Sequence, residues 1–448
     1  MNLSQATLRQ LCKGNFYTCS CGHTHTTYLD DLYIGPGALK HLSEVLDRYH
    51  ITKPFVVFDE NTLSACGDSL LASLQSYTPC NLGTERLEAG EVPLGHIASY
   101  WDDTCDGILA IGSGTVNDLS KMMAKMTKVP FVLVGTAPSM DGFVSTSAAM
   151  IVDGVKTTIN TPMPDTVILD TDILCKAPYR LLAAGLGDML AKAVSLVEWK
   201  IAHLLIDEFY CGEIASLVRR SLNLCLENAR DLPSRSETAV KNITEGLVLS
   251  GLAMTLAEVT RPASGMEHYV SHILDIRAVQ NNTLPDLHGI QVGLGTLVTL
   301  RMYDWLLTQK FDRERALRFY ETFSYDEWKK KMVEIFGASA PEIIRIEEES
   351  GKVDPEKARS RLPRIEEKWE EIQDIIRTEL PRADEIESLM KDAGLPTTFP
   401  EIGITPQVGL LCFYGTKEIR DKYVGTRLLW DIGLFDDAVE VIRKFLKA

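Results

Sequence analysis

Short apolar runs alternate with amphipathic segments over the first 177 residues of the chain. Runs rich in β-branched and other apolar residues predict buried strands, and apolar positions spaced by about 3.6 residues predict helices. The segments with strand character are Pro54–Thr62, Gly107–Met126 (strand, glycine turn and helix), Pro130–Phe143, Ala148–Asn160 (a hairpin turning at Asp153–Gly154) and Thr166–Asp170. This alternation predicts a parallel sheet with ligands at the carboxyl ends of its strands.

From about Pro178 onward, helical periodicity dominates and strand-like runs become rare. We therefore expect an α/β domain over residues 1–177 and a mainly α-helical domain over residues 178–448. Residues 325–395 are unusually charged, with Arg364–Leu380 at their centre. We interpret this stretch as a solvated amphipathic helix in preference to a partner-binding site.

Composition narrows the possible partners. The 448 residues include 62 acidic and 46 basic side chains, which gives a net charge of −16. This charge argues against nucleic acid or an anionic membrane as the main partner. The N-terminus lacks the apolar core of a signal peptide, and no apolar run reaches membrane-spanning length. The ten cysteines indicate reduced thiols in a cytoplasmic protein rather than a disulfide framework.

A glycine turn follows the strand that begins at Gly107. The sequence "LAIGSGTVND" places Gly112, Ser113 and Gly114 between this strand and a helix. Glycines allow the backbone to approach a pyrophosphate, and a helix N-terminus offers unpaired N–H groups. The pattern departs from the dinucleotide fingerprint G-x-G-x-x-G, because Asn117 stands at the third glycine position. A purely structural tight turn is the alternative interpretation.

An acid, Asp59, closes an earlier predicted strand. A carboxylate at this kind of position accepts hydrogen bonds from ribose hydroxyls and repels a 2′-phosphate, so it favours NAD over NADP. The alternative is an ordinary turn residue at the end of a strand.

Three places in the helical half carry potential metal ligands. Asp188 lies on a predicted helix just after two glycines. His268 and His272 are four residues apart and therefore face the same side of a helix, and His288 stands at the next predicted helix start. One carboxylate and two imidazoles with an open fourth position suit a catalytic zinc, iron or nickel ion. The alternative is that these histidines are ordinary polar residues of helices.

The N-terminal sequence "CSCGHTH" gathers Cys19, Cys21, His23 and His25. Such residues can hold zinc, but they lie too close in sequence for an ordinary zinc finger. Our default interpretation is therefore a loop with exposed thiols, and a structural metal site is the alternative.

Five sequence blocks occur together in order: "GSGTVNDLSK", "TAPSMDGFVSTSAAM", "GLGDMLAK", "SGMEHYVSH" and "LHGIQVGLGT". Through them the chain resembles the sn-glycerol-1-phosphate dehydrogenases, particularly their bacterial branch. That family belongs to the group of iron-type alcohol dehydrogenases, glycerol dehydrogenase and dehydroquinate synthase. The resemblance covers roughly residues 28–310 and, more loosely, the tail. Extra length between about 320 and 400 distinguishes the chain from its simpler relatives.

The resemblance implies a nucleotide-binding α/β domain and a helical metal- and substrate-binding domain, with the active site in the cleft between them. By analogy with the family's motifs, Asp188, His268 and His288 hold the metal, and Asp141 and His272 act on the substrate. The implied cofactor contacts are Asp59, Gly112, Ser113, Gly114, Thr115, Val116, Thr136, Ala137, Pro138, Ser139 and Ser145. His272 is also a candidate proton relay. Lys192, one turn after Asp188, and Arg261 are candidates for the substrate phosphate.

The reaction implied by the resemblance is the reversible reduction of dihydroxyacetone phosphate to sn-glycerol 1-phosphate, a step in phospholipid biosynthesis, by a metal-dependent NAD(P)H enzyme. The resemblance also suggests a homodimer. Within the group, the alternatives are a glycerol dehydrogenase acting on unphosphorylated polyols and a dehydroquinate-synthase-like cyclase. A non-catalytic binding or regulatory relative is the alternative from another class. The joint presence of Asp188, His268 and His288 argues against it.

Overall fold

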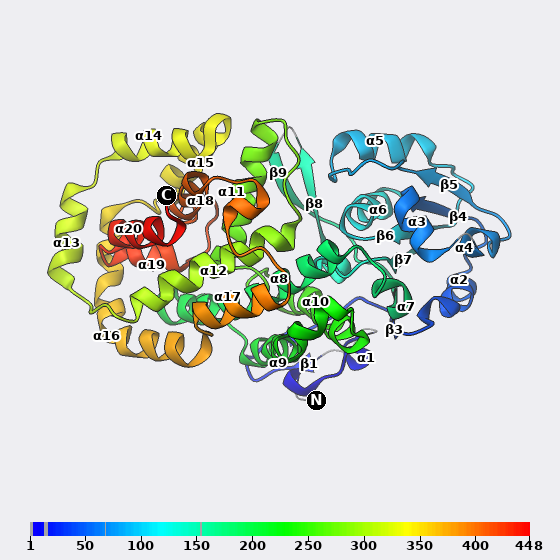
Figure 1. Cartoon of the computed structure of the whole chain (residues 1–448), viewed down its shortest axis with the longest axis horizontal. Coiled ribbons are helices and arrows are strands. Elements are labelled where there is room, and N and C mark those ends of the chain that lie inside the picture. Colours follow the sequence, from blue (N-terminus) through cyan, green and yellow to red (C-terminus); the bar gives the residue numbers. More distant parts are fainter. Residues whose placement is uncertain (1–2, 13–16, 68, 153–154) are drawn as a thin grey trace. The chain divides into compact units, whose positions relative to one another are not determined.

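The chain folds into two compact units in the computed structural model, which describes residues 3–12, 17–67, 69–152 and 155–448. The first unit comprises Met1–Met189 and Gly212–Thr260, and the second comprises Leu190–Cys211 and Arg261–Ala448. The chain thus leaves the first unit within one long helix, returns to it at Gly212 and leaves it again after Thr260. Figure 1 follows this path by colour.

A six-stranded parallel sheet forms the centre of the first unit, so the predicted α/β fold is confirmed. The strand order is β3-β10-β7-β6-β4-β5. The strands are β3 (Asp31–Gly35), β4 (Pro54–Phe58), β5 (Thr78–Asn81), β6 (Gly107–Gly112), β7 (Phe131–Gly135) and β10 (Thr166–Asp170). The sequence pattern did not single out β3 and β5. They are the two edge strands, and edge strands are less fully buried than central ones.

Helices and two small hairpins complete the first unit. The helices are η1 (Leu3–Gln5), α1 (Leu8–Leu11), η2 (Ala38–His41), α2 (Leu42–Arg48), α3 (Glu60–Cys66), α4 (Ser69–Ala72), α5 (Glu91–Tyr100), α6 (Gly114–Thr127), η3 (Asp141–Val144), α7 (Thr171–Leu174), α9 (Gly212–Asn228), η4 (Ala229–Ser234) and α10 (Glu237–Ala257). The hairpin strands are β1 (Tyr17–Thr18) with β2 (Thr24–His25), and β8 (Ser147–Val152) with β9 (Val155–Asn160). The predicted turn at Asp153–Gly154 lies outside the described residues.

Both faces of the sheet are buried, which explains why its central strands are almost continuously apolar. Alternate side chains, including Val56, Phe58, Leu109 and Ile111, form a core with η2 and α2 on one face. The intervening side chains, such as Ala110, are equally buried, and α6 packs against β6, β7 and β4.

The β-rich run over Pro54–Thr62 contains a strand and the start of a helix. β4 ends at Phe58, so Asp59 follows the strand as expected, and α3 begins at Glu60. Asp59 is the N-cap of that helix: its side chain accepts a hydrogen bond from the N–H of Thr62, and the Thr62 side chain accepts one from the N–H of Asp59. This reciprocal capping box starts the helix directly after the apolar run of the strand.

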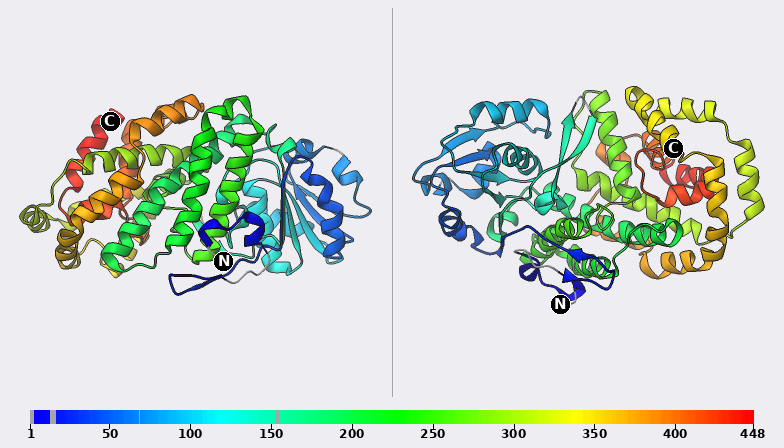
Figure 2. Two further views of the ribbon diagram at one scale, coloured as in Figure 1. Left: turned by 90° about the horizontal axis from the view of Figure 1, so that it is seen from below. Right: turned by 180° about the vertical axis from the view of Figure 1, so that it is seen from behind.

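The N-terminal segment lies against helices that follow it by some two hundred residues. η1 packs on α9, and α1 packs on α10. Figures 1 and 2 show this blue segment beside the green helices. The described N-terminal residues therefore belong to the fold of the first unit.

The second unit contains helices and no strand within its described residues. One long helix, α8 (Tyr179–Ile206), runs from the first unit into it. The others are α11 (Met266–Gln280), α12 (His288–Leu306), α13 (Arg313–Thr322), α14 (Tyr325–Phe336), η5 (Gly337–Ser339), α15 (Ala340–Ser350), α16 (Pro355–Glu379), α17 (Ala383–Asp392), η6 (Phe399–Ile402), α18 (Pro406–Gly415), α19 (Gly425–Asp431) and α20 (Phe435–Leu446). Among the described helices, none is both long and apolar enough to cross a bilayer.

The charged stretch around Arg364–Leu380 falls largely within α16 and is amphipathic, as predicted. Leu362, Ile365, Ile372 and Ile376 lie on its buried face. Most charged side chains between them are exposed or half-buried. Apolar packing on one side therefore holds this helix in place.

Candidate active site

Three of the predicted cofactor contacts follow neighbouring strands of the sheet. Asp59 follows β4, Ser113 follows β6 and Thr136 follows β7. β6 pairs with both β4 and β7. The chain passes from β4 to β5 on one side before it enters β6 on the other, so the strand order reverses between β4 and β6. Open α/β sheets bind ligands at the carboxyl ends of strands at such a reversal.

The start of α6 offers backbone N–H groups at this edge. Ser113 is the N-cap, and its side chain makes no capping hydrogen bond. The first hydrogen bond of the helix runs from the N–H of Asn117 to the C=O of Ser113, at 2.9 Å. The N–H groups between these residues have no acceptor within the helix and can bind an anion. Gly112 permits this close turn, because a Cβ there would lie 2.5 Å from the Cβ of Val116.

Several predicted cofactor contacts bond to the protein itself. The hydroxyl of Thr115 donates to the C=O of Leu87 at 3.1 Å. The hydroxyl of Ser145 accepts a hydrogen bond from Lys121 Nζ at 3.1 Å. Half-buried Asp59 uses Oδ1 to accept the N–H of Thr62 at 2.9 Å, and its Oδ2 has no hydrogen-bond partner among the described residues. Of these three side chains, that of Asp59 is the most available to a ligand.

The loop that follows β7 is closely packed. The N–H of Thr136 donates to the C=O of Gly112 at 3.1 Å, so the loop is tied to the glycine turn. Ala137 and Ser139 are buried. A Cβ at Gly185 of α8 would lie 2.0 Å from the carbonyl oxygen of Pro138, so only glycine allows the helix to pass here.

Two of the predicted acidic residues lie together in the first unit. The N–H of Asp141 donates to Asp188 Oδ2 at 2.9 Å. The hydroxyl of Ser250, on α10, donates to Asp141 Oδ2 at 2.8 Å. All three residues are buried. Sequence reasoning missed Ser250, which holds the Asp141 carboxylate in one orientation.

Lys121 is a second residue that the sequence analysis missed. Its side chain is fully buried, and its Nζ donates to the C=O groups of Gly142 and Ser147 as well as to Ser145. Burial lowers its pKa from the ordinary lysine value, and Asp118 at 3.7 Å opposes that shift. The signal in the sequence was a lysine placed directly before two methionines in "LSKMMAKM".

The second unit brings the three predicted histidines together. His268 and His272 lie on α11, and His288 is the first residue of α12, which packs against α11. The ring centroids of His268 and His288 are 5.1 Å apart, and that of His272 is 6.5 Å from His268 and 6.3 Å from His288. Ring nitrogens of His268 and His288 lie within 4.8 Å of each other.

Hydrogen bonds hold two of these rings, those of His268 and His288, through Nδ1. His268 Nδ1 lies 2.8 Å from Glu267 Oε1. His288 Nδ1 lies 3.2 Å from the hydroxyl of Ser271, which itself donates to Gln291 Oε1 at 2.8 Å. Because the hydroxyl of Ser271 donates its proton to Gln291, it accepts a hydrogen bond from His288 Nδ1. Both rings are therefore held through Nδ1.

A pair of buried glutamates supports the start of α11. Glu198 accepts hydrogen bonds from the N–H of Met266 at 2.8 Å and from the hydroxyl of Tyr303 at 3.0 Å. Burial raises the pKa of Glu198 and of Glu267 to about 7 each, and the two acids repel each other. A Cβ at Gly265 would lie 2.6 Å from a Glu198 oxygen. In the sequence, Glu198 appears as a single acid among apolar residues, and Glu267 directly precedes His268.

The two candidate phosphate-binding cations are buried and bonded to the protein. Lys192 Nζ donates to the C=O of Ala263 at 3.1 Å. Arg261 is paired with Glu208 and donates to the C=O of Tyr423 at 3.1 Å. Arg261 therefore joins two segments of the second unit, which is a structural role.

Comparison with known proteins places the fold in a class. A family model described as iron-containing alcohol dehydrogenase matches residues 33–178. The structure of glycerol dehydrogenase from Schizosaccharomyces pombe superimposes with a TM-score of 0.58 at 19% identity, covering 94% of this chain and 90% of that one. The chain therefore has the fold of the iron-type alcohol dehydrogenases.

Closer relatives define the family. A protein of Halalkalibacterium halodurans named glycerol-1-phosphate dehydrogenase, NAD(P)+, is 35% identical over 293 residues, which cover 64% of this chain and 73% of that protein. A Geobacillus thermodenitrificans protein of the same name is 33% identical over 354 residues, covering 75% and 87%. The chain belongs to the glycerol-1-phosphate dehydrogenase family, as its sequence motifs predicted.

Proposed function

We propose that the chain catalyses the reversible, NAD(P)H-dependent reduction of dihydroxyacetone phosphate to sn-glycerol 1-phosphate. Family membership supports this activity, because the relatives bear the name glycerol-1-phosphate dehydrogenase, NAD(P)+. The main observation behind the proposed chemistry is the histidine group of the second unit, where Nδ1 of His268 and Nδ1 of His288 each contact another side chain. A metal-binding histidine is usually held in this way through its outer nitrogen.

The proposed cofactor site is the carboxyl edge of the parallel sheet. The N-terminus of α6 would hold the cofactor's pyrophosphate, since its N–H groups need an acceptor. Asp59, with one carboxylate oxygen outside the cap of α3, would accept the ribose hydroxyls. We therefore propose that NADH is used at least as well as NADPH. The bound nicotinamide would supply the hydride.

The donor set fits a divalent metal. We propose Asp188, His268 and His288 as its ligands, which gives one carboxylate and two neutral imidazoles with room for substrate. Asp188 is already fixed by the N–H of Asp141, and Glu267 holds the ring of His268, as an outer partner of a metal-binding histidine does. A bound ion would make the carbonyl of the substrate more electrophilic. Zinc, nickel and iron all suit this set.

The remaining polar groups would orient substrate and move protons. We propose that His272 donates the proton that the product hydroxyl requires, because it lies beside both proposed histidine ligands without being needed as one. Asp141, held by Ser250, would accept a substrate hydroxyl. Lys192 would add positive charge toward the phosphate, one turn along α8 from Asp188.

Location and assembly complete the proposal. We infer a cytoplasmic enzyme, where its ten cysteines, all within the described residues and none in a disulfide, would stay reduced. We also infer a homodimer, which rests on the resemblance to the family.

The decisive experiment supplies dihydroxyacetone phosphate and NADH to the purified protein and determines the configuration of the product. We expect sn-glycerol 1-phosphate, with much slower turnover of unphosphorylated dihydroxyacetone. Equal or faster turnover of dihydroxyacetone would make the protein a glycerol dehydrogenase instead. Absence of net NADH oxidation with either substrate would contradict the proposal and favour the cyclase or the non-catalytic alternative.

A further inference from the structure

The N-terminal hairpin carries a second group of potential metal ligands, outside the proposed active site. β1 and β2 pair antiparallel, with Thr18 opposite Thr24. The turn between them is closed by hydrogen bonds from the N–H of Cys19 to the C=O of His23, at 3.2 Å, and from the N–H of Gly22 to the C=O of Cys19, at 3.0 Å. Gly22 has a φ of +85°, which favours glycine and lets the turn stay this short.

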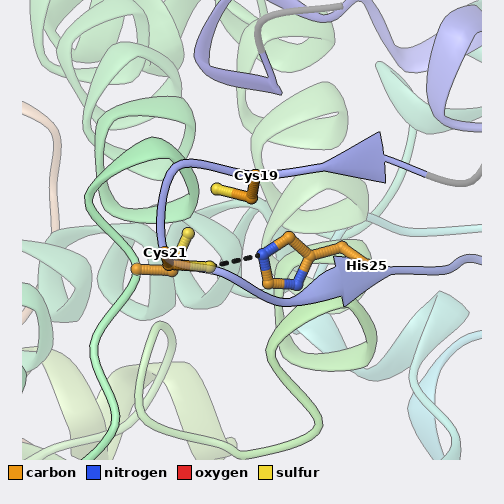
Figure 3. Close-up of side chains that lie close together, drawn as sticks. Cys19, Cys21 and His25 are labelled. Atoms are coloured by element: carbon orange, nitrogen blue, oxygen red, sulfur yellow. Dashed lines mark hydrogen bonds between the residues drawn. The ribbon is translucent and has the colours of Figure 1, made fainter.

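Three side chains of this hairpin converge. Figure 3 shows the thiols of Cys19 and Cys21 near the imidazole of His25. The Sγ of Cys21 lies 3.3 Å from His25 Nε2. Cys19 and His25 are only 6% and 2% exposed, and Cys21 is half-buried. The expectation of a loop with exposed thiols is therefore wrong, because the hairpin folds its thiols against the first unit.

Cys211 supplies a fourth donor. Its thiol is completely buried, and one donor atom from each of Cys19, Cys21, His25 and Cys211 lies within 4.8 Å of the others. In a tetrahedral zinc site with Zn–S of about 2.3 Å and Zn–N of about 2.0 Å, neighbouring donor atoms are roughly 3.5–3.8 Å apart. The group is thus close to the size that zinc requires.

The imidazole already has the orientation of a ligand. His25 Nδ1 lies 2.7 Å from the carbonyl oxygen of Leu256 on α10. A carbonyl oxygen only accepts, so Nδ1 carries the proton and Nε2 keeps its lone pair toward the thiols. A backbone carbonyl bound to the outer nitrogen is the usual partner of a metal-binding histidine.

Hydrogen bonds that need no metal hold the turn beside Cys211. Cys211 directly precedes α9, whose Glu213 accepts hydrogen bonds from the N–H of Ser20 at 3.3 Å and from its hydroxyl at 3.0 Å. Ser20 stands between Cys19 and Cys21, and it is 193 residues from Glu213 in sequence. Glu213 also accepts the N–H of Leu3 at 2.8 Å. These hydrogen bonds therefore help to hold Cys19 and Cys21 near Cys211.

We propose that Cys19, Cys21, His25 and Cys211 bind one structural Zn²⁺, separate from the ion of the active site. Three thiolates and one imidazole form a closed, soft donor set that suits structural zinc and leaves no position for substrate. The ion would join the N-terminal hairpin to the start of α9. Zinc binding releases the protons of the thiols. The stability of the hairpin and of the start of α9 would therefore depend on zinc concentration and on pH.

The test is metal analysis of the full-length protein, purified without chelators. We expect two metal equivalents per chain in the wild type. The variant with both His268→Ala and His288→Ala should keep one zinc, whereas Cys21→Ser and Cys211→Ser should each lose one equivalent. His23→Ala is the matched control, because His23 is an exposed residue of the same hairpin outside the group, and it should keep both ions.

This design separates the zinc site from the proposed function. Wild type with one equivalent that only the cysteine variants lose would support the zinc site and contradict the active-site metal. Cysteine variants with unchanged metal content would overturn the zinc site alone.

Measurements on the wild type test the zinc site even if the cysteine variants do not fold. We expect a mercurial reagent to release one zinc as three thiols react, and Co²⁺ substitution to give thiolate-to-cobalt charge-transfer absorption. Release of no zinc, or a disulfide among Cys19, Cys21 and Cys211 in freshly purified protein, would overturn the proposal.

Discussion

The sheet edge of the first unit and the histidine group of the second use different parts of the polypeptide. At the sheet edge, the main groups on offer are backbone N–H groups at the start of α6, shaped by Gly112. In the histidine group, the chemistry depends on side chains, and His268 and His288 are held by hydrogen bonds to Glu267 and Ser271. Most side-chain substitutions leave backbone N–H groups in place, whereas substitution of a metal ligand or a proton donor removes the functional group itself. Substitutions should therefore cost much more activity in the histidine group than at the sheet edge.

The largest expected effect is the loss of a proposed metal ligand. His268→Ala and His288→Ala should each lower bound metal and reduce kcat/KM by at least about 10³-fold, since metal polarisation of a carbonyl is worth several kcal/mol. Elemental analysis and steady-state kinetics on the same preparations check this. Full occupancy of the active-site metal with normal turnover in either variant would show that the ligand assignment is wrong.

His272 tests whether the histidine group separates binding from proton transfer. His272→Ala should keep most of its metal while kcat falls about 10²- to 10⁴-fold, the range for one positioned acid–base group. A smaller loss confined to KM would indicate contact with substrate. Loss of metal equal to that in His268→Ala would make His272 a ligand, and unchanged kinetics would leave it as a packed helix residue.

A substitution at Glu267 tests whether its contact with His268 strengthens metal binding. Glu267→Gln keeps the shape of the side chain but removes its charge, and we expect a 10- to 100-fold weaker affinity for the active-site metal. Competition with a chromophoric chelator measures this affinity. Glu379→Gln is the matched control in the same unit, because Glu379 forms an ion pair with Lys200. Equal affinities in the two variants would contradict the supporting role.

The smallest effect is expected at the sheet edge. Asp59→Ser should narrow the preference for NADH over NADPH by about tenfold, the value of one charge-assisted hydrogen bond. Serine can still cap α3, so the fold should be retained. Thr62→Ala, which alters the same cap but leaves the carboxylate, should not change the preference. A wild type that strongly prefers NADPH would show that Asp59 does not face the ribose.

Much of the fold could be predicted from local pattern. Buried strands such as β6 and β7 are apolar along their whole length, and β6 is followed by a glycine turn and a helix, as predicted. The edge strands β3 and β5 were not predicted, because partial burial weakens the apolar pattern of their residues. Periodicity also identified helices after Tyr179, but it carries no information about which helices pack with which unit. α9 and α10 return to the first unit because of contacts distant in sequence.

The candidate site divides in the same way. Sequence alone indicated His268, His272 and His288, because helical spacing and nearness in the chain place them on two successive helices. It also showed Cys19, Cys21 and His25, but not that Cys211 joins them. Only the tertiary structure decided that contact, and likewise that Ser250 holds Asp141. Local spacing fixes which side chains share a turn or a face, whereas partners far apart in sequence meet only when burial of the apolar core has packed their elements together.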